Sequence, residues 1–241
     1  MMEFILTILI FLLACYTLLG ETRALEPLQR AMTCVLALQG GKPQAGWAMQ
    51  HKLDLNYSPG HARDFEPAGY AATATAEMCR NLMRFLSLDW GILKYLARIP
   101  DAFEFLESIR YNDAQMKQLG KSVKPGQILC PTFVEVGTNR PLYLHNDPDH
   151  YWVDYDYHGL ITHYSSTRAI DLQSLKDEYQ HLLSLSKEEV TKDSPFIGQT
   201  DISGTLLSHL MRGKMQQADT QKVDSLLTNF EEKRLFTRSF A

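Results

Sequence analysis

The chain begins with an apolar run that no charged side chain interrupts. Residues 4–20 are seventeen uncharged positions, FILTILIFLLACYTLLG, with Glu3 before them and Glu21 and Arg23 after them. As a helix the run would extend roughly 25 Å, slightly less than the roughly 30 Å hydrocarbon core of a bilayer. We therefore expect residues 1–24 to form a single-pass membrane anchor or a signal segment, with residues 4–20 in contact with the membrane.

Three alternatives to a retained anchor stay open. The small residues around Arg23 would suit cleavage after Ala24, and Leu12-Leu13-Ala14-Cys15 loosely resembles a bacterial lipoprotein box with Cys15 as the lipidated residue. The run could also be a helix buried in the folded protein. The side of the membrane that holds the remainder of the chain depends on which alternative holds, because only an uncleaved anchor with nearby Lys and Arg would keep it in the cytoplasm.

Helical spacing dominates residues 25–120. Apolar residues recur three and four positions apart in 25–38, in 67–86, in the run that Asp89 begins, and in 100–110. This period predicts amphipathic helices, each presenting one apolar face to a core. Between the first two helices, residues 45–67 show no such period and are expected to form a loop with at most one strand.

After Lys124-Pro125-Gly126 the apolar period falls from 3.6 to 2. Residues 132–136, 142–145, 151–157 and 160–165 alternate between apolar and polar side chains, and turn-forming residues separate them. Alternation with a turn between each pair is typical of hairpins. The pattern predicts a four-stranded antiparallel meander within residues 128–168.

The helical period returns in residues 169–241. Asp171 is placed to cap a helix, residues 187–195 are expected to form a polar linker, and further helices are predicted at 202–215 and 219–236. The fold class is therefore α+β, with a helical layer packed on a small antiparallel β-meander and an N-terminal transmembrane or signal segment. Residues 25–241 are expected to form one domain: 25–120 mainly helical, 128–168 the meander, and 169–241 helical.

Charge and motif content exclude several classes of function. The 241 residues carry 24 Lys and Arg against 28 Asp and Glu, a net charge of -4. Because this balance offers no overall attraction for phosphate, we expect no nucleic-acid partner. The chain also contains no Cys-x-x-Cys, P-loop, dinucleotide-binding, Gly-x-Ser-x-Gly or His-Glu-x-x-His motif. We accordingly expect no cofactor.

Residues 145–158 have the most biased composition in the chain, with four aspartates, three histidines, four aromatic residues and no Lys or Arg. In a continuous strand, 152, 154, 156 and 158 would share one face, and 153, 155 and 157 the other. Aromatic rings offer contact area at little entropic cost, and carboxylates attract basic partners. We predict a protein-binding surface made of Asp149, Tyr151, Trp152, Asp154, Asp156 and His158.

Two catalytic alternatives and one without function compete with this prediction. Asp154, Asp156 and His158 could converge with His163 from the next strand on a divalent metal ion. Cys130 could act as a nucleophile with one of the histidines of the meander, provided that its pKa is lowered. The third alternative is an ordinary solvated acidic face on a half-buried sheet.

Together these patterns favour a protein that is not an enzyme. We expect a membrane-tethered envelope protein of bacterial type, acting as a protein-binding or assembly subunit through residues 130–168. A secretion-apparatus accessory subunit and an immunity-type protein both fit, and the partner would be another protein in a membrane-associated complex. The competing hypothesis is an envelope hydrolase that uses the Asp/His metal site or Cys130 with a histidine.

Overall fold

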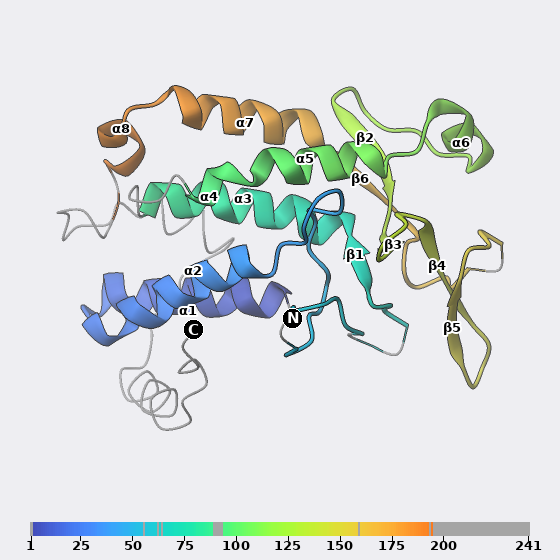
Figure 1. Ribbon diagram of the computed structural model, residues 1–241, viewed down its shortest axis with the longest axis horizontal. Helices are drawn as coiled ribbons and strands as arrows, with labels where there is room; N and C mark the ends of the chain where they lie inside the picture. The colour runs from blue at the N-terminus through green and yellow to red at the C-terminus, as the bar shows by residue number, and fades with distance from the viewer. Residues whose placement is uncertain are drawn as a thin grey trace.

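The computed structural model describes residues 2–54, 56–61, 63, 65–88, 94–158, 160–192 and 194. Over these residues the chain is a mixture of helices and antiparallel strands, so the α+β class is confirmed. Figure 1 shows the helices stacked side by side over most of the molecule and the strands at one end of it. The helices predicted at 202–215 and 219–236, and the helix start at Asp89, lie outside the described residues.

The N-terminal helix folds back on the helix that follows it. Helix α1 (Met2–Leu18) ends just before Gly20, whose φ of 65° lies in the left-handed region that favours glycine. A short 3-10 turn, η1 (Thr22–Ala24), then leads into α2 (Leu25–Ala37). The reversal lays α1 beside α2 (Figure 1).

In this structure the apolar N-terminal run contributes side chains to the protein's own core. Leu9, Leu12, Leu13 and Cys15 are all buried and belong to the same hydrophobic cluster as the inner face of α2. This packing is what the buried-helix alternative predicts. Among the described helices, none has both the length and the apolar character needed to cross a bilayer. Anchoring and signal-segment processing stay predictions.

The central helical layer follows the predicted apolar face. It consists of α3 (Ala72–Leu88), the short α4 (Lys94–Ala97) and α5 (Ile99–Ser108). Pro100 occupies the first turn of α5, where a missing N–H costs no helical hydrogen bond. The apolar residues of 67–86 that recur at helical spacing are all buried, Tyr70 just before α3 and the others within it: Ala74, Met78, Leu82 and Phe85.

The helix predicted from residue 67 begins later than expected, because its first residues form a strand. Strand β1 (Gly69–Ala71) pairs with β3 (Phe133–Glu135). A Cβ on Gly69 would lie 2.6 Å from the carbonyl oxygen of Val134, so the close approach of the two strands requires glycine. The pairing joins segments more than sixty positions apart in the sequence, which a local pattern does not reveal.

The predicted meander is only half correct. The pairing of β3 with β4 (Pro141–Asn146) and that of β4 with β5 (Tyr151–Asp154) are confirmed, but the last hairpin, between 151–157 and 160–165, does not form. The sheet order is β1-β3-β4-β5. Residues 160–165 form no strand: Leu160 makes an isolated bridge with His145, and the Ile161 N–H donates to the Leu144 carbonyl at 3.0 Å.

A second, two-stranded sheet lies beside the helical layer. Strand β2 (Gln127–Pro131) pairs along its whole length with β6 (Thr167–Asp171), a strand that the alternation did not predict. Asp171 ends β6 and caps α7 (Leu172–Ser184) as predicted, accepting a hydrogen bond from the Ser174 N–H. In the chain, the short α6 (Asp113–Gln118) follows α5 and precedes β2.

The polar linker predicted at 187–195 contains a helix. Helix α8 (Lys187–Thr191) begins with a capping box in which the Ser186 hydroxyl accepts from the Glu189 N–H and the Glu189 carboxylate accepts from the Ser186 N–H. The Ser-x-x-Glu spacing was a readable start signal. Only Val190 and Thr191 of α8 are buried, so the helix shows no apolar period in the sequence, and its charged residues resemble those of a linker.

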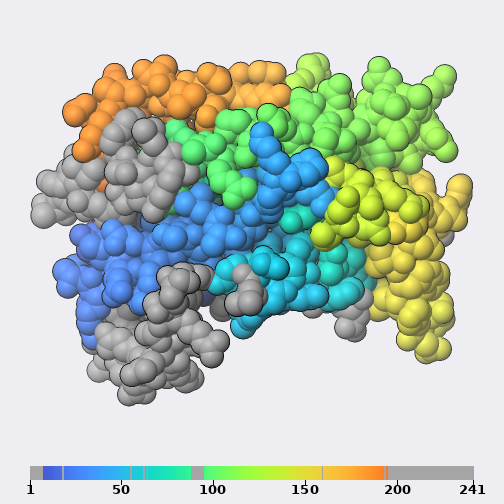
Figure 2. Space-filling model, in the orientation of Figure 1, coloured from blue at the N-terminus to red at the C-terminus, as the bar shows by residue number. Residues whose placement is uncertain are grey.

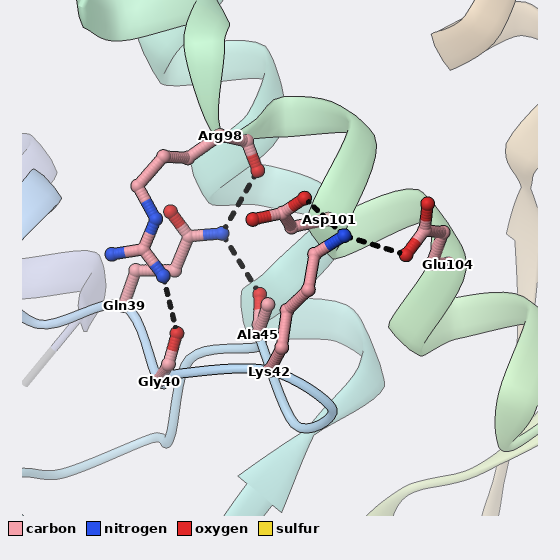
Figure 3. Close-up of polar contacts among 7 residues, drawn as sticks. All are labelled: Gln39, Gly40, Lys42, Ala45, Arg98, Asp101 and Glu104. Atoms are coloured by element: carbon pink, nitrogen blue, oxygen red, sulfur yellow. Dashed lines mark hydrogen bonds and ion pairs between the residues drawn. The ribbon is translucent and has the colours of Figure 1, made fainter.

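Polar contacts attach the loop after α2 to the junction of α4 and α5 (Figure 3). The side-chain amide of Gln39 donates to the carbonyls of Ala45, at 2.9 Å, and Arg98, at 3.1 Å. Arg98 in turn donates from its guanidinium to the Gly40 carbonyl at 2.7 Å. Gln39 is buried, so its amide cannot bind water. These hydrogen bonds satisfy the amide and the backbone carbonyls instead, and they hold the loop against the core.

One lysine and one tryptophan complete the attachment of this loop. The Lys42 ammonium lies 3.0 Å from a carboxylate oxygen of Asp101 and 3.1 Å from one of Glu104, and these partners raise the pKa of Lys42 (Figure 3). Trp47 is fully buried, and its indole N–H donates to the Val35 carbonyl at 2.8 Å. The irregular segment is thereby part of the folded core.

Candidate protein-binding site

The predicted contact residues lie on a hairpin at one end of the molecule. We call residues 141–158, which hold β4 and β5, the acidic-aromatic hairpin. The Asp147 N–H donates to the His150 carbonyl at 3.0 Å and closes the turn, while the Asp147 carboxylate accepts from the Asp149 N–H at the same distance. In Figure 1 the hairpin projects beyond the helices, and Figure 2 shows its yellow surface gathered at that end.

The rings of this hairpin are unusually exposed for their size. Tyr151 and Trp152 are each 38% exposed, and Tyr155 is 43% exposed. The Trp152 ring lies parallel to two imidazoles, with ring centroids 5.4 Å from His145 and 5.7 Å from His150. Trp152 is thus held in place by its neighbours while it keeps an accessible surface, as a contact residue requires.

Two of the predicted contact residues share a face with buried partners. The register pairs Trp152 with His145 and Asp154 with Tyr143, so these four side chains lie on one face of the hairpin. The buried His145 imidazole has its Nε2 atom 3.0 Å from a carboxylate oxygen of Asp154. Asp154 is therefore positioned by a buried ring while its outer side faces solvent.

Asp156 and His158 do not continue this face, which corrects the prediction. The strand ends at Asp154, whose carboxylate accepts a hydrogen bond from the Asp156 N–H at 2.7 Å. Asp156 then accepts from the backbone N–H of His158 at 3.0 Å and from its ring at 2.8 Å, and these bonds lower the pKa of Asp156. Aspartates that bond to the backbone two residues on form turns, which explains why the alternation stops here.

Tyr155 is a part of this surface that the predicted contact set does not contain. Its hydroxyl donates to the Glu135 carboxylate at 2.5 Å, and the Arg140 guanidinium lies 3.4 Å from its ring centroid. These contacts tie the end of the hairpin to the β3–β4 turn. The alternation placed Tyr155 on the face opposite Asp154. Its exposed ring joins this surface because β5 ends at Asp154, which only the structure shows.

Tyr151 lies on the opposite face, among other rings. Its ring centroid is 5.5 Å from that of Phe65 and 6.3 Å from that of His163. His163 also packs edge-on against Phe65, at 5.3 Å. The histidine that was expected near the acidic row is therefore on the other side of the strand from Asp154.

The metal hypothesis has no support in the described part of the chain. There, no group of three or more His, Cys, Asp or Glu side chains is arranged to hold a metal ion. Asp156 and His158 bind each other in a local turn, and His163 faces away from Asp154. The four side chains do not converge because the strand that was to carry all of them ends early.

Cys130 is unsuited to act as a nucleophile. Its thiol is fully buried in β2 and lies 3.7 Å from the Leu106 carbonyl. Burial raises the pKa of Cys130 to about 12, so the thiol stays protonated near neutral pH. A reactive cysteine needs a lowered pKa and access to substrate. Cys130 has neither and serves as a core side chain.

Comparisons with known proteins assign no family to the chain. No protein-family model matches it, and no curated protein is similar to it in sequence. The functional inference therefore comes from the site itself. That site offers exposed rings, carboxylates and an outer strand, which suit recognition of another protein.

Proposed function

We propose that this protein is a protein-binding or assembly subunit whose contact surface is the acidic-aromatic hairpin. The observation that carries the proposal is the exposure of three rings: Tyr151 and Trp152 on β5, the outermost strand of the sheet, and Tyr155 directly after it. Large exposed rings in one place are uncommon on a protein surface that binds nothing. Recognition of a protein uses every one of these features, and no catalytic group is required.

The charge around the rings selects a basic partner. Residues 141–158 contain four aspartates and no Lys or Arg, and the exposed ones include Asp149 and Asp156. Arg140, just before the hairpin, already lies over the Tyr155 ring. A partner with exposed Lys or Arg would be steered to this surface, and the association rate would fall with added salt.

Attachment to a membrane through residues 4–20 is a separate part of the proposal, together with a place in the envelope as a secretion-apparatus accessory or immunity-type subunit. Insertion of α1 would remove Leu9, Leu12 and Leu13 from the core. The anchored state and the packed state of α1 are therefore alternatives. Alkaline carbonate extraction of cell membranes separates them: an inserted helix stays with the membrane, and a packed one leaves with the peripheral proteins.

Photo-crosslinking with matched charge controls tests the binding surface. A photoreactive amino acid is placed at Tyr155, and crosslinked proteins are identified in extracts of the producing cells. The doubly substituted Asp149→Asn/Asp154→Asn chain should lose the crosslinked product, because it lacks two charges of the surface. Asp113→Asn/Asp177→Asn changes the net charge equally but on exposed positions of α6 and α7, so its product should remain.

The aromatic contribution is tested in the same assay. Trp152→Ala should reduce the yield of the specific product about tenfold or more, because buried tryptophans dominate the binding energy of many interfaces. Equal yields from the hairpin variants, the α6/α7 control and the unaltered chain would refute this surface as the binding site.

A further inference from the structure

The outer edge of β5 has backbone groups that point away from the sheet. In an antiparallel pair, residues that exchange hydrogen bonds alternate with residues that do not. The bond from the Asp147 N–H to the His150 carbonyl identifies that pair as a bonded one. The register then makes the pairs of Trp152 and Asp154 bonded, and those of Tyr151 and Val153 unbonded.

A second bond confirms this assignment from the other side of β4. Leu144 is the partner of Val153, and its carbonyl accepts from the Ile161 N–H at 3.0 Å, on the side of β4 away from β5. The backbone of Leu144 therefore points away from Val153, as an unbonded pair requires. By the same geometry the N–H and C=O groups of Tyr151 and Val153 point outward, beyond β5.

Among the described strands, β5 pairs only with β4 and ends the order of the sheet (Figure 1). Natural sheets blunt such edges or pair them with another chain, since an open edge is a template for a further strand. Here the strand carries exposed rings on both faces, Trp152 on one and Tyr151 on the other. An added strand would find backbone partners along the edge and a ring beside it on each face.

We propose that an extended segment of the partner protein adds to the edge of β5 as a further antiparallel strand, with Lys or Arg at alternate positions. This inference rests on the proposed binding function of the acidic-aromatic hairpin. Alternate residues of the added strand lie on the face of Trp152 and Asp154, where a basic side chain meets a carboxylate and a ring. The residues between them lie beside Tyr151 and Val153 and are apolar.

A second copy of the chain is a poor occupant of this edge. Pairing β5 with itself would bring together two hairpins of the same negative charge, and residues 141–158 hold no Lys or Arg to neutralise it. Repulsion between these like charges opposes pairing. Charge complementarity therefore points to a different protein with a basic strand.

A short labelled peptide in which arginine and valine alternate is the probe, with fluorescence anisotropy of the full chain as the measurement. The peptide should bind at least about tenfold more tightly than one in which glutamate replaces arginine. Val153→Pro removes one outward N–H without touching the β4 ladder, and it should weaken binding about tenfold or more. Val153→Ala keeps that N–H and loses only part of a side-chain contact, so it should weaken binding clearly less than Val153→Pro.

Two N-methylated peptides keep the test independent of how well Val153→Pro folds. In an antiparallel added strand the valines lie opposite Tyr151 and Val153, so their amides point toward the β5 edge and the arginine amides point to solvent. A methyl group on a valine amide therefore blocks a bond to β5, and one on an arginine amide does not. Strand addition requires one set to abolish binding and the other to leave it unchanged. Equal effects of both sets would overturn strand addition, as would equal binding of the arginine and glutamate peptides.

The outcomes separate this inference from the function on which it rests. If Trp152→Ala loses the peptide while Val153→Pro and both methylated peptides bind normally, strand addition is wrong and the hairpin remains a binding surface. Failure of the proposed function itself is seen in the crosslinking experiment, which does not use the peptide.

Discussion

A single methyl group at Gly46 should destabilise the protein measurably. A Cβ at this position would lie 2.4 Å from one ring carbon of Phe105, 2.7 Å from a second, and 2.8 Å from the hydroxyl oxygen of Thr75. Both neighbours are fully buried. The Thr75 hydroxyl also accepts from the Trp47 N–H at 3.0 Å and donates to the Ala71 carbonyl at 2.9 Å, so it does not move freely.

The magnitude follows from how far the neighbours must move. Carbon atoms pack at roughly 3.5–4.0 Å, so the Phe105 ring would have to shift by about 1 Å inside a close-packed core. Overpacking of this kind typically costs about 1–3 kcal/mol. Replacing glycine by alanine returns about 0.4–1 kcal/mol through the unfolded chain. The net loss is therefore about 0–2.6 kcal/mol. We expect Gly46→Ala to lower the free energy of unfolding by about 2 kcal/mol, in the upper part of this net range, since both neighbours are held.

Urea unfolding followed by far-UV circular dichroism measures the effect, with a control in the same loop. A Cβ on Gly41 would meet nothing within 4 Å, so Gly41→Ala should be neutral or slightly stabilising. In a Phe105→Leu background the penalty of Gly46→Ala should shrink, because the ring carbon at the shortest contact is gone. If Gly46→Ala proved as stable as Gly41→Ala, the packing of this loop against α5 would be wrong.

Two further predictions concern buried groups. Tyr111 and Tyr143 share a hydrogen bond of 2.8 Å between buried hydroxyls, so each single change to Phe should cost about 1–3 kcal/mol, and the double change less than their sum; additive losses in urea unfolding would contradict the bond. Burial raises the pKa of the Cys79 and Cys130 thiols from 9.0 to about 12. Above pH 9 the unfolded chain therefore loses protons that the folded chain keeps, and stability falls by up to about 1.4 kcal/mol per pH unit for each thiol. Under reducing conditions between pH 8 and pH 11, Cys130→Ala should flatten this decline, and an unchanged slope would refute it.

The helices were predictable because their hydrogen bonds are local. Helix α2 matches the expected segment 25–38 within one residue at its end, and Asp171 caps α7 as expected. In both cases the apolar period and the end signal fall within a single window of the sequence. The β3–β4 hairpin was predictable for the same reason, since a short turn joins its strands.

The errors fall where a partner lies far away in the chain. Residues 69–71 have the composition of a helix start, yet they pair with β3, and β6 pairs with β2 across about forty residues. Residues 160–165 alternate like a strand, but the turns at Asp154 and Asp156 lead the chain away from β5, and Leu160 and Ile161 reach the other side of β4, where they make one isolated bridge and one hydrogen bond. Strand formation depends on an available edge, and alternation alone does not specify one.

What the amino-acid sequence determined about the candidate site is its composition: aspartates, rings and no cation within residues 145–158. Only the tertiary structure decided that β5 is the outermost strand, that Asp156 and His158 leave its face, and that Tyr155 joins the surface. It also decided that the apolar N-terminal helix lies on α2. The physical reason is the same in each case. Composition and periodicity are properties of neighbours in the chain, whereas exposure, edge position and burial depend on which distant segments pack together.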